Sequence, residues 1–276
     1  MEIDRKTTQL ITLALKEDIG PGDITTFSIV NTKKKGRGII IAKENCVLVG
    51  IDIVKKVFHK IDSSITFLNA FADGSKIKKG QRVIEVIGPL SSLLTGERTA
   101  INFLQHLSGI ATMTNKFVTA IKGTGASILD TRKTTPGWRA LEKYAVLMGG
   151  GRNHRTGLYD GILIKDNHIQ AAGGIERAIK KAKKNSGRLK IEVETETLKD
   201  VKEALIAGAD IIMLDNMSIT TIKKAVRLID GKALIEVSGN VSLKSINSLA
   251  KTGVDFISVG AITHSAPSVD LSMKIL

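Results

Sequence analysis

The stretch KIEVETETLKDVKEALIAGADIIMLD, residues 190–215, decides the fold of this chain. Two short apolar runs, at 190–194 and 209–215, have the length and composition of buried strands. Between them, residues 197–207 carry apolar side chains at helical spacing. A strand, a helix and a second strand in this order form a unit whose two strands lie parallel.

The same alternation continues on both sides of this unit. One strand ends roughly every 20 to 30 residues, which is the period of consecutive strand–helix units. Such units form either a barrel or an open sheet, and six strands favour an α/β barrel, complete or incomplete. The expected strands are 126–130, 161–166, 190–194, 209–215, 233–239 and 255–260, and the expected helices are 138–148, 174–185, 197–207, 218–228 and 243–252.

The first half of the chain lacks this rhythm. A helix is expected over 6–16 and ends at a Gly-Pro-Gly-Asp turn, residues 20–23. Three strand-like segments, divided by Gly-bearing turns and a helix at 54–61, lead into a long helical pattern over 91–122. This half therefore predicts a small α+β domain.

Composition limits the class of protein. The chain has 276 residues, of which 42% are hydrophobic and only 4% aromatic, so the core is expected to consist of Ile, Leu, Val and Ala. A single cysteine, Cys46, excludes an intramolecular disulfide and a Cys-based zinc site. No apolar run approaches the roughly 20 residues of a membrane helix, and the N-terminus lacks a signal peptide's apolar core. A soluble cytoplasmic protein without a membrane partner is predicted.

The net charge of +14 raises the question of nucleic-acid binding. Most of the 41 Lys and Arg residues are scattered, and the densest run, residues 33–37, has no aromatic neighbours for base stacking. That run is interpreted as a solvated turn, and no nucleic-acid partner is expected.

Cations gather in one segment, DTRKTTPGWRALEKYAVLMGGGRNHRTGLYDGILIKDNHI, residues 130–169. Positive charges repel one another unless an anion lies between them. The segment therefore predicts a pocket for a substrate with several negative charges. Its basic residues are Arg132, Lys133, Arg139, Lys143, Arg152, His154, Arg155, Lys165 and His168.

Polar residues end one predicted strand after another, where parallel α/β folds place their chemistry. Gly turns after the last two strands suit phosphate binding, because free backbone N–H groups face the anion. Carboxylates midway suit sugar hydroxyls or a magnesium ion that carries phosphates. The strand ends thus predict sites for a sugar phosphate, a metal and a second acidic molecule. They are Asp130-Thr131-Arg132-Lys133, Lys165-Asp166-Asn167-His168, Glu194, Asp215, Ser238-Gly239-Asn240 and Gly260-Ala261.

Several residues in this set allow more than one role. Lys165 could form a Schiff base, but nearby carboxylates oppose the lowered pKa that this requires, and charge contact is favoured. His154 fits either a ligand contact or a loop histidine, and the run 149–151 fits either a phosphate loop or a helix stop. The remaining histidines without ligand spacing, His59, His106 and His264, are interpreted as structural.

These residues carry a resemblance that runs nearly end to end. The chain resembles the decarboxylating quinolinate phosphoribosyltransferases, also called nicotinate-nucleotide pyrophosphorylases. The resemblance implies an α/β sandwich over 1–110 and an incomplete barrel over 111–276, with the last residues packing back on the first domain. The matching segments are EDIGPGDITT (17–26), GERTAINFLQHLSGIAT (96–112), residues 130–169, the strands ending in Glu194 and Asp215, VSGN (237–240) and VGAITHSAP (259–267).

The resemblance also implies a role for each cation. Arg132, Arg155 and Lys165 would hold the two carboxylates of quinolinate, with His154 close by. Arg98 would reach the same pocket from a second subunit. A homodimer or homohexamer with shared active sites is therefore implied.

The second substrate implied is 5-phosphoribosyl 1-pyrophosphate. Lys133 would face it, while Glu194 and Asp215 would contact its ribose hydroxyls and bound Mg²⁺; these three are the predicted catalytic residues, with no direct metal ligand assigned. Thr131 belongs to the same predicted substrate site. The 5′-phosphate would be bound by Ser238, Gly239, Asn240, Gly260 and Ala261.

The implied reaction gives nicotinate mononucleotide, pyrophosphate and CO₂, a step of NAD biosynthesis. Two departures stand out: Trp138 replaces a smaller aliphatic residue, and Asn240 stands where many relatives carry Gly.

Four alternative functions are less favoured. The complete set of Arg98, Arg132, Arg155 and Lys165 favours a dicarboxylate substrate and argues against a same-fold relative linked to molybdenum transport, whose substrate is uncertain. A nicotinate phosphoribosyltransferase binds a monocarboxylate and would not need so many cations. A nucleic-acid binder would depend steeply on salt, and a Schiff-base aldolase would be trapped by borohydride at Lys165.

Overall fold

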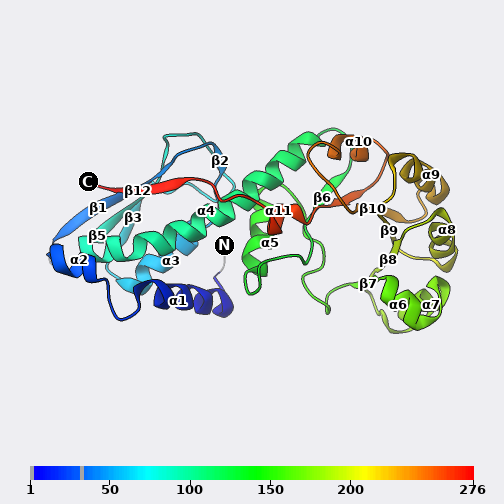
Figure 1. The fold of residues 1–276 in the computed structure, drawn as a ribbon, viewed down its shortest axis with the longest axis horizontal. Coiled ribbons are helices and arrows are strands. Elements are labelled where there is room, and N and C mark those ends of the chain that lie inside the picture. Colours follow the sequence, from blue (N-terminus) through cyan, green and yellow to red (C-terminus); the bar gives the residue numbers. More distant parts are fainter. Residues whose placement is uncertain (1–2, 32–33) are drawn as a thin grey trace. The chain divides into compact units, whose positions relative to one another are not determined.

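The computed structural model describes residues 3–31 and 34–276, and the chain divides into two compact units (Figure 1). The first unit comprises residues 1–115, 135–150 and 265–276, and the second comprises 116–134 and 151–264. Each is described separately below. Within the described residues, none of the helices has both the length and the apolar character needed to span a bilayer.

The first unit is built on a four-stranded antiparallel sheet in the order β12-β1-β5-β3. Its strands are β12 (Leu271–Ile275), β1 (Lys35–Ala42), β5 (Arg82–Pro89) and β3 (Thr66–Leu68), so the end of the chain pairs with β1. A second, two-stranded sheet joins β2 (Cys46–Val47) to β4 (Lys76–Ile77). The helices of this unit are α1 (Arg5–Ile19), α2 (Ile24–Ile29), α3 (Ile51–Ile61), most of α4 (Leu90–Ala120) and α5 (Arg139–Met148).

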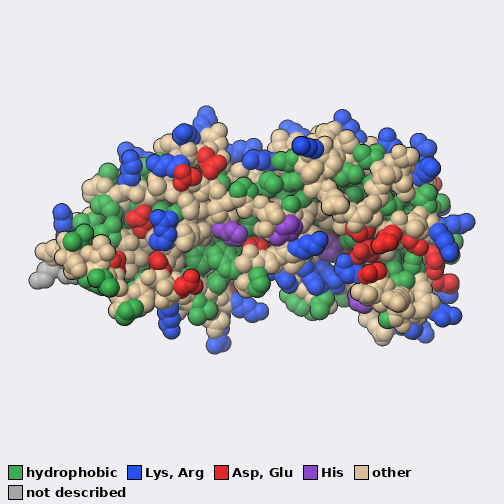
Figure 2. Space-filling model, viewed as in Figure 1, with side chains coloured by type: hydrophobic (Ala, Val, Ile, Leu, Met, Phe, Trp, Pro, Cys, Tyr) green, Lys and Arg blue, Asp and Glu red, His purple; other side chains and the backbone are tan. Residues whose placement is uncertain are grey.

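In this unit the structure corrects one sequence interpretation and decides between the alternatives of another. Residues 35–37 do not form a solvated turn: they begin β1, where Arg37 forms an ion pair with the buried Glu85 of β5; Lys33 lies outside the described residues. Gly149 ends α5, so a helix stop describes the start of the 149–151 run. Figure 2 shows Lys and Arg side chains spread over the visible face and not gathered in one stripe.

The second unit is an open, six-stranded parallel sheet in the order β6-β11-β10-β9-β8-β7. Because β6 and β7 are its edges, the barrel is incomplete, as the family resemblance implies. Its strands are β6 (Ser127–Leu129), β7 (Ile162–Ile164), β8 (Ile191–Thr195), β9 (Ile211–Asp215), β10 (Leu234–Ser238) and β11 (Phe256–Ser258).

Helices connect these strands and line the outer side of the sheet (Figure 1). Fully buried aliphatic residues of both layers, such as Val193, Ile212 and Ile222, form the core between them. The helices are α6 (Asp166–Ala172), α7 (Ile175–Asn185), α8 (Leu198–Ala207), α9 (Ile219–Ile229), α10 (Ile246–Ala250) and α11 (Ala261–His264). The register aligns the strand ends, with Ser238 beside Asp215 and Glu194 beside Met213.

Candidate active site

The carboxyl ends of the parallel strands surround a cavity of about 530 Å³ that lies wholly within the second unit. The structure brings eleven of the fourteen predicted substrate residues to its wall. The lining residues are Thr131, Arg132, Lys133, His154, Arg155, Leu163, Lys165, Glu194, Met213, Asp215, Asn216, Glu236, Ser238, Gly239, Asn240 and Ser258.

One wall of the cavity is cationic. Burial, and then the positive charge of Arg132, lower the pKa of the Arg155 guanidinium below its usual value. The guanidinium groups of Arg132 and Arg155 repel each other, and an anion between them would relieve the repulsion. Nη1 of Arg155 donates to the carbonyl of Gly161 at 3.0 Å, which leaves further N–H groups of its fork for a carboxylate. The wall therefore suits a ligand with carboxylate groups.

Lys165 precedes α6 and stands opposite a carboxylate. Its Nζ lies 2.8 Å from Oε2 of Glu194, with side-chain exposures of 47% and 16%. Its backbone N–H donates to Nδ1 of His168 at 3.0 Å, which holds the start of α6. The ion pair is half open to water, so its own contribution to stability is small, and the ammonium group remains able to turn to an anion in the cavity.

Lys133 is held by its backbone while its side chain is exposed. Its N–H donates to Oγ1 of Thr131 at 3.0 Å, and its carbonyl accepts from Oγ1 of Thr263 at 2.8 Å. The side-chain stem packs on Gly260, where a Cβ would lie 3.2 Å from Cδ of Lys133. Gly260 therefore supports Lys133 from beneath and does not itself line the cavity.

The turn after β10 has positive φ angles at two successive residues. Gly239 and Asn240 have φ of +94° and +47°, and Asn216, after β9, has φ of +51°. A Cβ on Gly239 would lie 2.1 Å from Oδ1 of Asn216. Nδ2 of Asn216 donates to Asp215 at 2.7 Å, so the two strand ends form one polar surface with Ser238.

The carboxylates of Glu194 and Asp215 extend from neighbouring strands into the same cavity. Carboxylate oxygens are the donors that magnesium accepts from proteins, usually with water and substrate phosphates completing its shell. The two residues present therefore fit a magnesium ion that a phosphorylated substrate brings with it.

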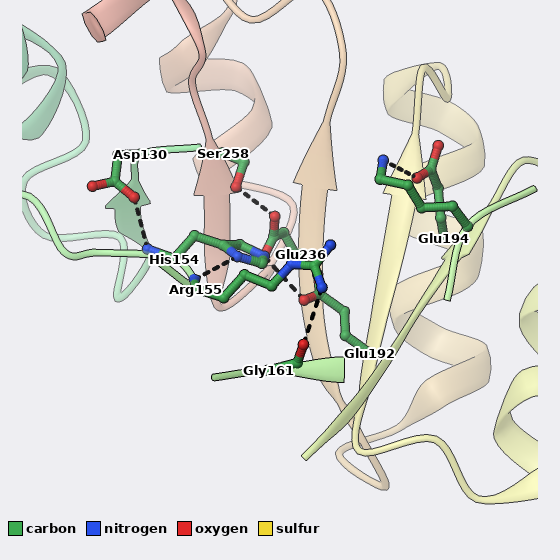
Figure 3. A network of polar contacts seen from close by, with 9 residues as sticks. Asp130, His154, Arg155, Gly161, Glu192, Glu194, Glu236 and Ser258 are labelled. Carbon is green, nitrogen blue, oxygen red and sulfur yellow. Dashed lines mark hydrogen bonds and ion pairs between the residues drawn. The ribbon is translucent and has the colours of Figure 1, made fainter. Parts of the chain in front are cut away.

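Part of the cavity wall belongs to a buried polar cluster, drawn in Figure 3. Nε2 of His154 is 3.0 Å from Glu192 and 3.7 Å from Glu236, whose side chains are 7% and 1% exposed. Oγ of Ser258 donates to Glu236 through a short hydrogen bond. Burial, and then the charge of Glu192, raise the pKa of Glu236 to about 8.

Sequence reasoning missed several residues at this site. The sequence does point to Glu192 and Glu236, because a charged residue in the middle of a strand that is buried on both faces is unusual. Asn216 follows a predicted catalytic residue directly. His264 lies one helical turn from Gly260, with its Nε2 3.2 Å from where a Cβ on that glycine would be, and the structural role assigned to it did not anticipate this.

Other named residues lie elsewhere. Arg98 is exposed on α4 in the first unit, and Ala261 begins α11. His106 bonds to the buried Glu142 at 2.9 Å, and His59 to the carbonyl of Ile65 at 2.9 Å. The departing residue Trp138 stacks on Phe103 with ring centroids 4.6 Å apart, so its ring is part of the first unit's packing.

Comparison with known proteins gives a consistent result over the whole chain. The family model "Quinolinate phosphoribosyl transferase, N-terminal domain" matches residues 23–108, and the corresponding C-terminal domain model matches 110–274. A Bacillus subtilis protein named probable nicotinate-nucleotide pyrophosphorylase [carboxylating] is 45% identical over 94% of this chain and 90% of its own length. A Nicotiana tabacum quinolinate phosphoribosyltransferase [decarboxylating] is 39% identical over 96% of this chain and 81% of its own.

Among solved structures, the nicotinate-nucleotide pyrophosphorylase from Francisella tularensis superimposes with a TM-score of 0.95 at 45% identity. The superposition covers 98% of this chain and 96% of that one.

Proposed function

The chain belongs to the quinolinate phosphoribosyltransferase family, and we propose that the cavity at the carboxyl ends of its barrel strands is where it carries out the reaction. It is a pentosyltransferase that transfers phosphoribosyl from 5-phosphoribosyl 1-pyrophosphate to quinolinate with decarboxylation, a step of NAD biosynthesis. The names carboxylating and decarboxylating denote this one reaction in opposite directions. The comparisons do not favour the molybdenum-transport relative.

One observation carries the assignment of the site: three cations, two carboxylates and a glycine turn line one cavity. Arg132, Arg155 and Lys165 would bind the two carboxylates of quinolinate. The turn at Ser238 and Gly239, with Asn240, would hold the 5′-phosphate, supported by Gly260 and Ala261.

The steps of the reaction then give each side chain a role. The pyridine nitrogen attacks C1 of the ribose as pyrophosphate leaves, and positive charge develops on the sugar ring. Glu194 and Asp215 would stabilise that charge, while Lys133 would face the pyrophosphate. Mg²⁺, when bound near Glu194 and Asp215, would supply neutralising charge for the pyrophosphate. The quaternary ring nitrogen then accepts the electron pair released when the adjacent carboxylate leaves as CO₂.

The reaction is tested with purified protein, quinolinate, phosphoribosyl pyrophosphate and magnesium. We expect CO₂ and nicotinate mononucleotide in equal amounts, loss of both after chelation, and recovery when magnesium is returned. Mononucleotide formed without CO₂, or turnover that persists after exhaustive chelation, would contradict the proposal.

Arg98 lies in the first unit, whereas the cavity lies in the second, and we propose that a homodimer or homohexamer shares its sites between subunits. Arg98→Ala and Lys165→Ala should each be inactive alone. Unfolded together and refolded, the pair should regain about a quarter of wild-type activity, because random pairing in a dimer leaves that share of sites intact. Hybrids that form, as verified by native mass spectrometry, yet remain inactive would exclude the shared site.

We also propose that the protein is located in the reducing cytoplasm. This location is supported by the single, buried thiol of Cys46.

A further inference from the structure

The buried cluster of His154, Glu192 and Glu236 has no part in the reaction as derived so far. Ligand atoms of these three side chains lie within 4.8 Å of one another, a spacing that could hold a metal ion. The hydrogen bonds of the imidazole decide between a metal and a purely protein network.

The backbone N–H of Arg155 donates to Nδ1 of His154 at 2.7 Å. Nδ1 therefore carries a lone pair, and the proton of the neutral ring is on Nε2. A metal on Nε2 would require a proton on Nδ1, where it would oppose the N–H of Arg155. With the proton on Nε2, the ring instead donates to Oε2 of Glu192 at 3.0 Å.

The two carboxyl groups are also complementary if they share one proton. Oε1 of Glu192 is buried and accepts no hydrogen bond from the described part of the chain. A protonated Glu236 offers the missing donor, and its other oxygen accepts from Ser258. Two ionised carboxylates this deeply buried would repel each other strongly, so one retained proton is expected.

The hydrogen-bond network continues to Arg155 in the cationic wall of the cavity. The His154 backbone N–H donates to the buried Asp130 at 2.8 Å, and the Arg155 guanidinium is fixed by Gly161 (Figure 3). The backbone of residues 154–155 is thus held from one side by Asp130 and from the other by the imidazole. Any rotation of that ring would move the main chain that carries Arg155.

We propose that Glu192 and Glu236 are positioning residues, which lock His154 as the neutral Nε2–H tautomer and thereby orient Arg155 toward a carboxylate of quinolinate. This inference rests on the proposed function of the cavity. In this arrangement His154 holds Arg155 in position and does not donate a proton to the substrate. Because Glu236 stays uncharged at neutral pH, the interior adds only one negative charge beneath a site for a dianion.

Steady-state kinetics with matched variants tests the arrangement. Glu236→Leu removes the partner of both Ser258 and Glu192, and it should raise the KM for quinolinate by about tenfold or more, since leaving buried polar groups unsatisfied costs about 1–3 kcal/mol. The KM for phosphoribosyl pyrophosphate should change by less than about twofold. Glu236→Gln, whose amide can donate to Glu192 and accept from Ser258, should recover most of the lost quinolinate affinity.

The pH dependence of the quinolinate KM distinguishes this positioning role from a purely structural one. The charged groups that face Glu236 are Glu192 from β8 and His154 from the segment after α5. In the wild type Glu236 ionises as the pH rises through about 8. The quinolinate KM should rise over the same range, because a second negative charge then lies close to the bound dianion. The Glu236→Gln variant cannot ionise, so its KM should stay level through that range.

If Glu236→Leu fails to fold, Ser258→Ala and nitrogen NMR of the wild type replace it. Ser258→Ala should raise the pH at which the quinolinate KM rises, because the hydroxyl donates to the Glu236 carboxyl and this hydrogen bond lowers the pKa of that group. The ¹⁵N shifts of His154, assigned by their loss in His154→Asn, should show a neutral Nε2–H ring at pH 7. A charged or Nδ1–H ring, equal effects on both KM values, or a Gln variant as impaired as the Leu variant would overturn the inference. Loss of the wild-type reaction would instead refute the proposed function, since the NMR result does not depend on turnover.

Discussion

Arg132→Met lowers kcat/KM for quinolinate by about a hundredfold to a thousandfold, because removing one partner of a desolvated charge pair costs about 2–5 kcal/mol. The variant keeps much of the side chain's apolar bulk, so the cavity wall stays filled. Steady-state kinetics at saturating phosphoribosyl pyrophosphate measures the effect. It should appear in the quinolinate KM and in kcat, while the KM for the phosphoribosyl donor changes little.

The control for this variant is Arg188→Met, which removes an exposed guanidinium after α7 and leaves the cavity untouched. It lowers the net charge equally, so any general electrostatic attraction of the anionic substrates falls equally in both variants. If Arg188→Met lost as much activity as Arg132→Met, the net charge of the chain would be responsible and the dicarboxylate pocket would not.

Gly239→Ala raises the KM for phosphoribosyl pyrophosphate by about a hundredfold or more, as the loss of two or more hydrogen bonds to a charged group implies. The added Cβ would lie 2.1 Å from Oδ1 of Asn216, which therefore must move. That movement breaks its hydrogen bond to Asp215 and disturbs its contact with Asn240. Isotope-labelled donor binding at equilibrium, together with kinetics, measures the change.

Gly231→Ala separates this collision from simple backbone strain. Gly231 also has a positive φ, +72°, but a Cβ there meets no atom within 4 Å. It should cost roughly 1–2 kcal/mol of stability, as for any side chain in the left-handed region, with kinetics unaltered. A phosphoribosyl pyrophosphate KM raised equally by both alanines would show that the turn after β10 does not bind the phosphate.

The parallel strands were the part of this molecule most open to prediction. Runs such as 190–194 and 209–215 are apolar throughout because both faces of the sheet are covered, and their ends identify the residues that meet at one edge. The strand ends alone identify Thr131, Arg132, Lys165 and Asp215, and all four line the cavity.

Other features depended on contacts that spacing does not encode. The strand β12 is short and pairs with β1, more than two hundred residues earlier. Spacing does not predict this pairing, and only the family resemblance implies that the last residues pack back on the first domain. The helix α5 was expected among the barrel helices, but it belongs to the first unit, where Tyr144 donates to Asp73. The roles of Glu192 and Glu236 depend on their convergence from separate strands on one histidine, and the sequence contains the residues but not that distance.

The claim that the cavity is built for a dicarboxylate is tested most directly by calorimetric binding of quinolinate against nicotinate. Nicotinate keeps the ring and one carboxylate, so the comparison isolates the second carboxylate and the cations that face it. We expect quinolinate to bind at least about a hundredfold more tightly, as one lost charge-assisted contact of about 3 kcal/mol implies, and Arg132→Met to reduce the difference. Equal affinities for the two acids would contradict the account.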